Sequence, residues 1–312
     1  MSNTDAPAIN KAGFVAVLGL PNAGKSTLVN ALVGAKVTIV SRKAQTTRAP
    51  VRGIFIEDDA QVILVDTPGL LVPDAQRKRA RLETAMQSAA ISSLEDGDAA
   101  MLVIDASVPR KLETLQRFIK GLDGGLPANT IAVLNKVDLI AKHKLLDLAT
   151  AISQLHPFAA YYMISAETGD GIDDLRRGLA RLVPESPALY DVDQLSDLPV
   201  RLMLAELTRE QIFNYLHDEI PYGTHVVTDD VVTRENDVVA ITQRIVVLRD
   251  THKAMMIGRD GAMLKRIGSA TRAGMEESLQ TRVFLDLSVS VDARWTDNKA
   301  YYALWGFGGH GE

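Results

Sequence analysis

The chain of 312 residues contains no cysteine, which excludes disulfides, thiolate metal sites and cysteine nucleophiles and indicates a reducing compartment. It has only six histidines, and no pair of them has metal-ligand spacing, so a zinc enzyme is not expected. Long apolar runs are also missing: residues 14–20 are too few to span a membrane and lack the flanks of a signal peptide. These absences predict a cytoplasmic protein without a transmembrane segment.

Excess positive charge is absent as well, because the formal net charge is −5. This charge is unevenly distributed: residues 191–240 carry a net charge of −8, whereas residues 241–299 carry +3. A phosphate responds to the local charge more than to the total. The negative sum therefore does not exclude a nucleic-acid partner.

Short apolar runs typical of buried parallel strands alternate with helical patterns in the first part of the chain. The expected strands are residues 14–18, 62–65, 101–104, 131–134 and 161–164. The expected helices include residues 26–33, 79–93, 113–119 and 173–182. This alternation predicts an α/β domain with a doubly wound, mostly parallel sheet.

The second half of the chain predicts a smaller α+β domain with the order α-β-β-α-α-β. Its expected elements are a helix at 200–216, strands at 225–233 and 237–248, a helix–turn–helix around 258–261 and a strand at 283–291. Prolines and aspartates between the two halves indicate a linker. We therefore expect a flexible tail at 1–12, a first domain at 13–184, a linker at 185–197, a second domain at 198–295 and a C-terminal helix or tail at 296–312.

The strongest motif is a phosphate-binding loop that follows the first strand and opens a helix. It matches G-x-x-x-x-G-K-[ST], whose backbone N–H groups and helix N-terminus bind phosphates. Lys25 is expected to contact the β- and γ-phosphates, and Ser26 to bind Mg²⁺. The predicted phosphate-binding residues are Gly19, Leu20, Pro21, Asn22, Ala23, Gly24, Lys25, Ser26 and Thr27.

A second motif, N-K-x-D, is expected to recognise the base of a bound nucleotide. It comprises Asn135, Lys136, Val137 and Asp138 and directly follows a predicted strand, where an open parallel sheet forms its binding crevice. The carboxylate of Asp138 can accept hydrogen bonds from guanine N1–H and the guanine amino group. Adenine offers neither of these two donors at the same positions. Ser165, Ala166 and Glu167 follow the last strand and are expected to add backbone contacts to the base.

Two further segments have the positions of nucleotide-sensing switches. The first switch contains Gln45, Thr46, Thr47 and Arg48, and a threonine there could close on Mg²⁺ when GTP binds. The sequence does not decide between Thr46 and Thr47, and we favour Thr47. The second switch contains Asp66, Thr67, Pro68, Gly69 and Leu70. Asp66 is expected to hold Mg²⁺ through water, and the Gly69 amide to sense the γ-phosphate.

These motifs, in this order, resemble a translation-factor-type GTPase of the Ras-like superfamily. The run from Ser41 to Arg48, together with one GTPase domain followed by the second half, closely resembles the Era family over residues 13–295. Ala49 and Pro50 depart from that family, which commonly has a histidine after the arginine. Leu70 stands where many Ras-like proteins carry a water-orienting glutamine, so slow intrinsic hydrolysis is expected. The resemblance implies that Asn22 holds a potassium ion against the phosphates.

The second half contains a G-x-x-G turn between two helices, flanked by cations. Glycines let a nucleic-acid backbone approach closely, and the cations can then meet its phosphates. The I-G-x-x-G-x-x-[LI]-K-x-[IL]-G pattern and the element order resemble a type II KH domain, which implies RNA binding. The candidate RNA-binding residues are His252, Lys253, Ile257, Gly258, Arg259, Asp260, Gly261, Lys265 and Arg266.

The function that these observations favour is a GTP-binding and GTP-hydrolysing switch coupled to an RNA-binding domain. The family resemblance implies that the partners are GTP or GDP, Mg²⁺, the small ribosomal subunit and its RNA near the 3′ end, with a role in small-subunit assembly. It further implies a monomer that can associate peripherally with the inner membrane. Three alternatives remain at this point: an RNA-binding protein with a non-catalytic nucleotide domain, a metabolic P-loop enzyme such as a nucleotide kinase, and another ribosome-linked GTPase with a KH-like appendage. A nucleotide kinase would need a lid and an arginine cluster, and neither is recognisable in the sequence.

Overall fold

The computed structural model describes residues 8–41, 43, 48, 51–66, 84, 92–108, 112–122, 125–298 and 301. These residues form two compact units: the first ends at Asp197, and the second begins at Leu198 and also includes the described residues 39–41, 43 and 84. No helix among the described residues is long and apolar enough to cross a membrane.

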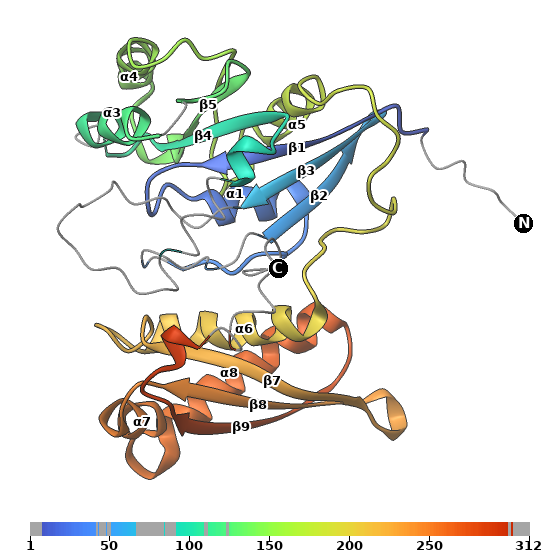
Figure 1. Ribbon diagram of the computed structural model, residues 1–312, viewed down its shortest axis with the longest axis vertical. Coiled ribbons are helices and arrows are strands. Elements are labelled where there is room, and N and C mark those ends of the chain that lie inside the picture. The colour runs from blue at the N-terminus through green and yellow to red at the C-terminus, as the bar shows by residue number, and fades with distance from the viewer. Residues whose placement is uncertain are drawn as a thin grey trace, which may run out of the picture. The chain divides into compact units, whose positions relative to one another are not determined.

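A six-stranded sheet forms the centre of the first unit (Figure 1). Its strands are β1 (Lys11–Leu18), β2 (Val51–Glu57), β3 (Ala60–Asp66), β4 (Ala99–Asp105), β5 (Thr130–Asn135) and β6 (Tyr161–Met163), in the order β2-β3-β1-β4-β5-β6. All neighbours pair in parallel except β2 and β3, which form an antiparallel hairpin. The carboxyl ends of the parallel strands therefore share one edge, which is where such sheets bind ligands.

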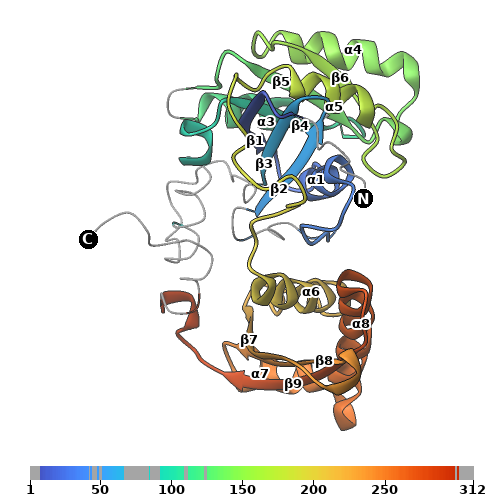
Figure 2. The same cartoon turned by 90° about the vertical axis from the view of Figure 1, so that its right-hand side faces the viewer.

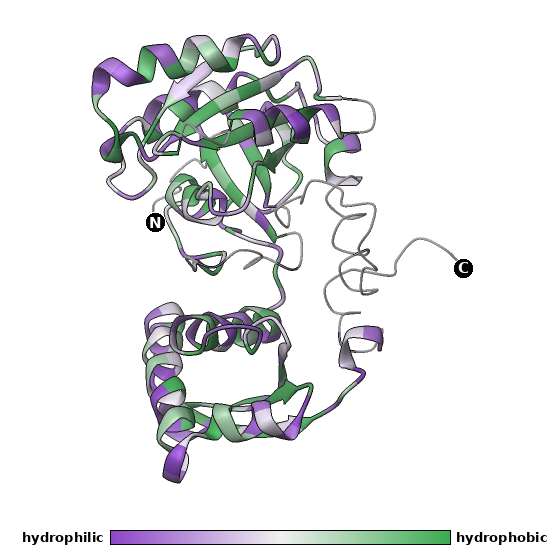
Figure 3. Cartoon of the chain, turned by 90° about the vertical axis from the view of Figure 1, so that its left-hand side faces the viewer, coloured by the Kyte–Doolittle hydropathy of each residue, from purple (hydrophilic) through white to green (hydrophobic). Residues whose placement is uncertain are grey.

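Helices cover both faces of this sheet (Figure 2). They are α1 (Lys25–Val33), α3 (Leu112–Lys120), α4 (Lys142–Ser153) and α5 (Ile172–Ala180), with a short 3₁₀ turn, η2 (Val137–Leu139), after β5. Residues of α1 and α5 pack into one core, and residues of α3 and α4 into the other. Coverage on both sides explains why these strands are continuously apolar, as the hydropathy colouring shows (Figure 3).

The second unit is a three-stranded sheet with helices packed on one face. Its elements are α6 (Val200–Tyr215), β7 (Thr224–Thr233), η3 (Glu235–Asp237), β8 (Val239–Val247), α7 (Asp250–Ile257), η4 (Arg259–Gly261), α8 (Ala262–Leu279), β9 (Val283–Val291) and η5 (Trp295–Asp297). The strand order is β7-β8-β9, with β7 antiparallel and β9 parallel to β8. The predicted order α-β-β-α-α-β is confirmed.

The core of the second unit joins all three of its long helices to the sheet. Ile212 of α6, Met256 of α7 and Ile267 of α8 pack with Ile245 and neighbouring residues of β8. Met255, the residue before the buried Met256, is 56% exposed because it lies on the outer side of α7. The helical period places adjacent residues on different sides.

The C-terminal side of the second unit closes over the other end of its sheet. Trp295 is fully buried, donates its indole N–H to the carbonyl of Gly223 at 3.1 Å and stacks on His225. Tyr301 meets the same histidine ring edge-on, with ring centroids 5.5 Å apart. Tyr301 is therefore a packing residue, while the other aromatic residues near the C-terminus lie outside the described residues.

Residues 185–197, which we expected to form a linker, instead lie along the sheet of the first unit. Gln61 in β3 is fully buried; its amide oxygen accepts hydrogen bonds from the N–H groups of Leu189 and Tyr190, at 2.8 and 3.0 Å. Its amide nitrogen donates to the carbonyl of Tyr190 at 2.8 Å. Further along, the N–H of Ile54 in β2 donates to the carbonyl of Leu195 at 2.8 Å. We call residues 185–197 the strap.

Two other features differ from the sequence-based expectations. Strand β1 begins at Lys11, because its first residues pair with β3, so residues 11 and 12 belong to the sheet and not to a flexible tail. The apolar runs also do not include β2, an edge strand whose Gly53 lies against α1. A glycine in a strand weakens its pattern, which explains why the sequence gives little signal there.

Candidate nucleotide site and RNA-binding face

The phosphate loop runs from the end of β1 into α1, as the motif predicts. Gly24 precedes the helix in the left-handed conformation, with φ of 91°. A Cβ atom at this position would lie 2.4 Å from the side-chain nitrogen of Asn135. Only glycine can therefore adopt this backbone and also allow the base-recognition segment to pack against the loop.

Lys25 is the first residue of α1, and its side chain folds back under the loop. Its ammonium group is buried and donates to the carbonyl oxygens of Gly19 and Leu20, at 3.0 and 3.4 Å. Burial lowers the pKa of Lys25, and the nearby carboxylate of Asp66 offsets part of this effect. A cation held among loop carbonyls beside a helix N-terminus is suited to binding phosphate.

Ser26 and Asp66 come together from α1 and from the end of β3. The hydroxyl group of Ser26 donates to Asp66 Oδ2 at 2.8 Å, and Asp66 is fully buried. These two hard oxygen donors fit Mg²⁺, which typically takes one or two protein oxygens and completes its octahedron with phosphates and water. No group of three or more carboxylates and histidines that could hold a metal occurs among the described residues, so an all-protein cage is not present in that part of the chain.

Asn135, at the end of β5, connects three predicted nucleotide-binding segments. Its amide nitrogen donates to the carbonyl of Ala23 in the phosphate loop at 3.0 Å. Its amide oxygen accepts the N–H groups of Lys136 and Ala166, at 2.8 and 3.0 Å. Ser165, the residue before Ala166, is buried, and its hydroxyl oxygen accepts the N–H of Thr168 at 3.2 Å. The structure therefore brings together segments that are far apart in the sequence.

Lys136 forms a second connection across the site. Its ammonium group donates to the carbonyl of Asn22 at 2.8 Å and to Oδ2 of Asp105 at 2.7 Å. Asp105, the last residue of β4, belongs to none of the sequence motifs. An available signal was a carboxylate placed directly after an apolar run, the same position that Asp66 has in β3.

Asp138 and Asn22 both present exposed side chains at this edge of the sheet. Asp138 lies in η2, and among the described residues no hydrogen bond engages its carboxylate. Asn22 has the left-handed conformation, with φ of 64°, which asparagine tolerates better than most residues. Val137 is half-buried between them and the core, and Glu167 is exposed.

Several predicted switch residues lie outside the described residues: Gln45, Thr46, Thr47, Thr67, Pro68, Gly69 and Leu70. The choice between the two threonines as a Mg²⁺ ligand therefore stays a prediction. Arg48 is described and is buried, with 4% exposure.

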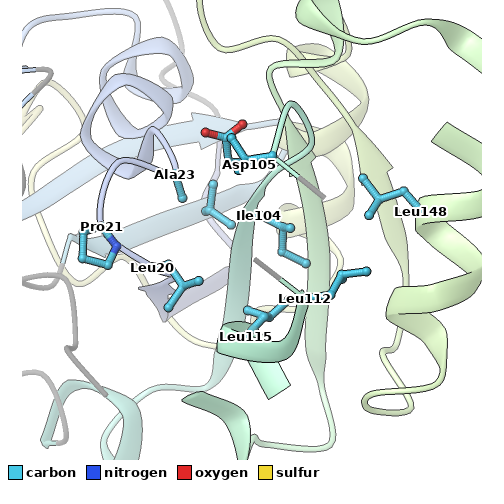
Figure 4. Close-up of a pocket in the computed structure, with 10 residues that line it drawn as sticks. Leu20, Pro21, Ala23, Ile104, Asp105, Leu112, Leu115 and Leu148 are labelled. Atoms are coloured by element: carbon cyan, nitrogen blue, oxygen red, sulfur yellow. The ribbon is translucent and has the colours of Figure 1, made fainter. Parts of the chain in front are cut away.

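A pocket opens beside the phosphate loop, between β4, α3 and α4 (Figure 4). Its lining is apolar except for Asp105, and it includes Leu20 and Pro21 of the loop and Leu115 of α3. An apolar lining does not suit phosphate. The cradle for phosphates is thus the loop itself and not this pocket.

In the second unit, the G-x-x-G turn joins α7 to α8. Gly258 has φ of 72°, and a Cβ atom there would lie 2.7 Å from Cβ of Met263. Gly261 also has positive φ, 77°, but a Cβ atom there would meet nothing within 4 Å. Between them, Arg259 and Asp260 are almost fully exposed, and their charged groups lie 3.6 Å apart. The turn is therefore open to solvent, with partly balanced charge.

The flanking cations are not equivalent. Lys265 and Arg266 are exposed, and the Arg266 guanidinium lies over the ring of Tyr215, 4.3 Å from its centroid. Lys253 and Ile257 are half-buried. His252 differs from the expectation: its side chain is only 6% exposed and its Nε2 lies 3.8 Å from Glu219. Because α7 packs this histidine inward, it does not contribute a surface cation beside the turn.

Comparisons with known proteins agree with this division into two units. The model of a family described as 50S ribosome-binding GTPase matches residues 14–136, and the model of the KH domain matches residues 219–296. GTPase Era of Bradyrhizobium diazoefficiens is 47% identical over 302 residues, covering 97% of this chain and 96% of that protein. The chain belongs to the Era family of GTPases. GTPase Era of a Geobacter species is 40% identical over 297 residues, covering 95% and 98%.

Solved Era structures share the whole fold of this Era-family chain. A variant of Aquifex aeolicus Era bound to GDP·AlF₄⁻ is 36% identical, has a TM-score of 0.84 and covers 95% of this chain and 99% of its own. Era in complex with MgGDPNP and nucleotides 1506–1542 of 16S ribosomal RNA is also 36% identical, with a TM-score of 0.85 and coverage of 96% and 99%. The fold class is confirmed, and the chain is a GTPase. The interpretation as a non-catalytic nucleotide domain is not supported.

Proposed function

We propose that this GTPase is a nucleotide-driven switch whose KH domain binds the 3′ region of small-subunit ribosomal RNA during assembly of that subunit. The observation that carries the proposal is the solved Era complex with nucleotides 1506–1542 of 16S ribosomal RNA, which covers 96% of this chain. The exposed G-x-x-G turn with Lys265 and Arg266 supports it, because it offers close backbone approach and positive charge.

RNA binding at this turn is tested with two substitutions of one residue. Gly261→Asp and Gly261→Asn have nearly equal size, tolerate positive φ and have space for a Cβ atom, so they differ mainly in charge. We expect the aspartate variant to bind a 3′ fragment of 16S RNA at least about tenfold more weakly than the asparagine variant, with a difference that shrinks as salt rises. Gly258 is unsuitable, because any side chain there meets Met263.

The measurement is fluorescence anisotropy of labelled RNA with the protein in GDPNP and in GDP, with GDP affinity of each variant as the control. Equal RNA affinity of the two variants at low salt would show that the turn does not approach the RNA backbone.

The choice of ribosomal subunit needs its own experiment, because the matching family model is described by the large subunit. Sedimentation of the protein with purified 30S and 50S subunits, in GDPNP and Mg²⁺, separates the two. The proposal requires cosedimentation with 30S subunits. Binding to 50S subunits alone would favour a large-subunit role.

We propose that Ser26, Asp66 through water and Thr47 hold Mg²⁺, which supplies charge neutralisation between the phosphates. This assignment is supported by the hydroxyl oxygen of Ser26 and Oδ2 of Asp66, which lie 2.8 Å apart and are both of the ligand type that Mg²⁺ prefers. Guanine recognition is assigned to Asn135, Lys136 and Asp138. In this proposal the protein acts in the cytoplasm as a monomer. Cell fractionation would show whether part of it is bound to the inner membrane.

We also propose that Asn22 binds K⁺. Its exposed side chain lies in the phosphate loop, and Leu70 supplies no water-orienting group, so a monovalent cation would provide transition-state charge. GTP turnover should be faster in potassium than in sodium at equal ionic strength, and Asn22→Ala should remove the difference. Equal wild-type rates in the two salts would exclude this role.

A further inference from the structure

Asp105 is the centre of a polar network that the nucleotide motifs do not include. Its Oδ2 accepts the ammonium group of Lys136 at 2.7 Å. Its Oδ1 accepts the hydroxyl and the N–H of Ser107, at 2.5 and 3.0 Å. Both carboxylate oxygens are therefore occupied, and the side chain is only 8% exposed.

The geometry of Lys136 shows what this carboxylate controls. Lys136 has a left-handed backbone, with φ of 66°, and its side chain crosses from the end of β5 to the phosphate loop. Its Cε lies 3.8 Å from where a Cβ atom of residue 24 would be. Two anchors hold the ammonium group at the far end: the carbonyl of Asn22 and the carboxylate of Asp105. Figure 4 shows Asp105 at the end of β4, on the side where Ala23 of the loop lies.

A carboxylate is a stronger acceptor for an ammonium group than a carbonyl is. Burial by itself raises the pKa of Asp105, but the hydrogen bonds from Lys136 and Ser107 outweigh it, so the net pKa lies below the ordinary value. Asp105 is thus charged at neutral pH. Without that charge, the long Lys136 side chain would keep one neutral acceptor and regain rotamer freedom.

We propose that Asp105 is a positioning residue for nucleotide binding: it fixes the Lys136 side chain across the site, so that the apolar stem of Lys136 forms a wall for the guanine ring. The inference rests on the proposed assignment of guanine recognition to Asp138. Asp105 itself does not contact the nucleotide. It acts by joining β4, the base-recognition segment and the phosphate loop before the nucleotide arrives, which reduces the entropy lost on binding.

A purely local role is the competing explanation. The bonds between Asp105 and Ser107 are typical of a turn that an aspartate stabilises after a strand. That role predicts a loss of stability without any specific coupling to Lys136. The two explanations therefore differ in a double-mutant cycle.

The experiment measures the dissociation rate of a fluorescent GDP from the full chain, with thermal stability measured in parallel. Asp105→Asn removes the charge at constant size and should speed dissociation at least about tenfold. Lys136→Met keeps the apolar stem, removes the ammonium group and should have a similar effect. The double variant should dissociate no faster than Lys136→Met alone, because both changes remove the same contact.

Three controls keep the result interpretable. Asp105→Glu retains a carboxylate that can follow the flexible ammonium group, so it should restore most of the slow dissociation. Asp174→Asn removes an exposed carboxylate of α5 that pairs with Arg177 and belongs to none of the nucleotide motifs, so it should leave the rate unchanged. Asp138→Ala tests the underlying site: normal GDP binding by this variant would contradict the proposed guanine site itself.

Wild-type dissociation in Asp105→Asn would overturn the proposal, as would rates that multiply in the double variant. An Asp105→Glu variant as fast as Asp105→Asn would equally favour the local turn. If Asp105→Asn folds poorly, the comparison of Asp105→Glu with and without Lys136→Met measures the same coupling.

Discussion

At the scale of single residues, the nucleotide site depends on polar side chains buried at the ends of neighbouring strands. Asp66 ends β3, Asp105 ends β4 and Asn135 ends β5. Parallel strands bring these ends to one edge of the sheet, and each side chain then satisfies a partner from another segment. Burying such groups is costly unless they are hydrogen-bonded, so the network fixes the arrangement of the loops.

The exposed carboxylate of Asp138 leads to a prediction about base choice. Asp138→Ala should weaken GTP binding by several kcal/mol, roughly the value of two charge-assisted hydrogen bonds. Asp138→Asn should shift preference toward xanthine nucleotides, whose C2 carbonyl can accept a hydrogen bond from the new amide. Competition binding with GTP, XTP and ATP measures both effects. Unaltered GTP affinity in both variants would contradict the assignment.

The buried ammonium group of Lys25 leads to a prediction about pH. Burial lowers its pKa below 10.5, so Lys25 loses its proton at a lower pH than an exposed lysine does. Phosphates bind the protonated form, so GDP affinity should fall as pH rises through this lowered pKa. Titration calorimetry from about pH 7 to pH 10 measures the fall. Lys25→Ala should bind weakly throughout and show a smaller pH dependence. A wild-type GDP affinity that is constant over this pH range would contradict the role of the Lys25 ammonium group in phosphate binding.

The position of a residue in the fold can be predicted from the sequence where a motif has fixed spacing, and cannot be predicted where a contact depends on packing. Lys25, Ser26 and Asn135 lie where their motifs predict. His252 faces inward because of how α7 packs, and nothing in the local sequence distinguishes it from Lys253. Asp105 needs the register of β4 beside β5, which only the folded sheet provides.

At the scale of elements, the spacing of apolar residues predicted most of the strands and helices that the structure describes. Their observed ends differ from the predicted ends by one to three residues. The expected strand at 62–65 extends to Ala60–Asp66, and β9 has the expected bounds. The contacts of the strap could not be predicted, because prolines and aspartates indicate an irregular backbone but not what that backbone packs against. Hydrogen bonds from a single buried glutamine carry no sequence period.

The strap gives a prediction about stability. Gln61→Ala removes three hydrogen bonds to Leu189 and Tyr190 and leaves their backbone groups without that partner. We expect a loss of roughly 1–3 kcal/mol in the free energy of unfolding of the first unit. Urea unfolding measures this loss. Gln194→Ala, whose side chain only reaches the nearby carbonyl of Ser196, is the matched control with a smaller effect.

At the scale of the whole molecule, the fold class and the order of the two domains could be predicted from motifs, but the limit of the first unit could not. The first unit continues to Asp197, and α6 begins at Val200. Only Leu198 and Pro199 therefore separate the strap from α6, the first helix after it in the second unit. Domain limits drawn from composition alone would remove the strap from the unit to which it is bonded.

This limit predicts how fragments behave. A fragment of residues 1–197 should bind GDP like the full chain and should melt several degrees higher than a fragment of residues 1–184, because only the longer one keeps the bonds to Gln61 and Ile54. Differential scanning calorimetry of both fragments, with GDP, measures the difference. Equal melting temperatures would mean that the strap contributes no net stability.

The strap also covers the outer edge of β2. Gly53 pairs with Ser196, and the Ile54 N–H is bonded to the Leu195 carbonyl, on the side of β2 where the described part of the chain has no other strand. At the opposite edge, β6 is only three residues long, too short to template another chain. The strap therefore covers the edge of β2 at which a strand of another molecule could otherwise pair. A chain whose strap detaches would expose the edge of the seven-residue strand β2, which includes the apolar run Ile54–Ile56, so we expect detachment to promote aggregation.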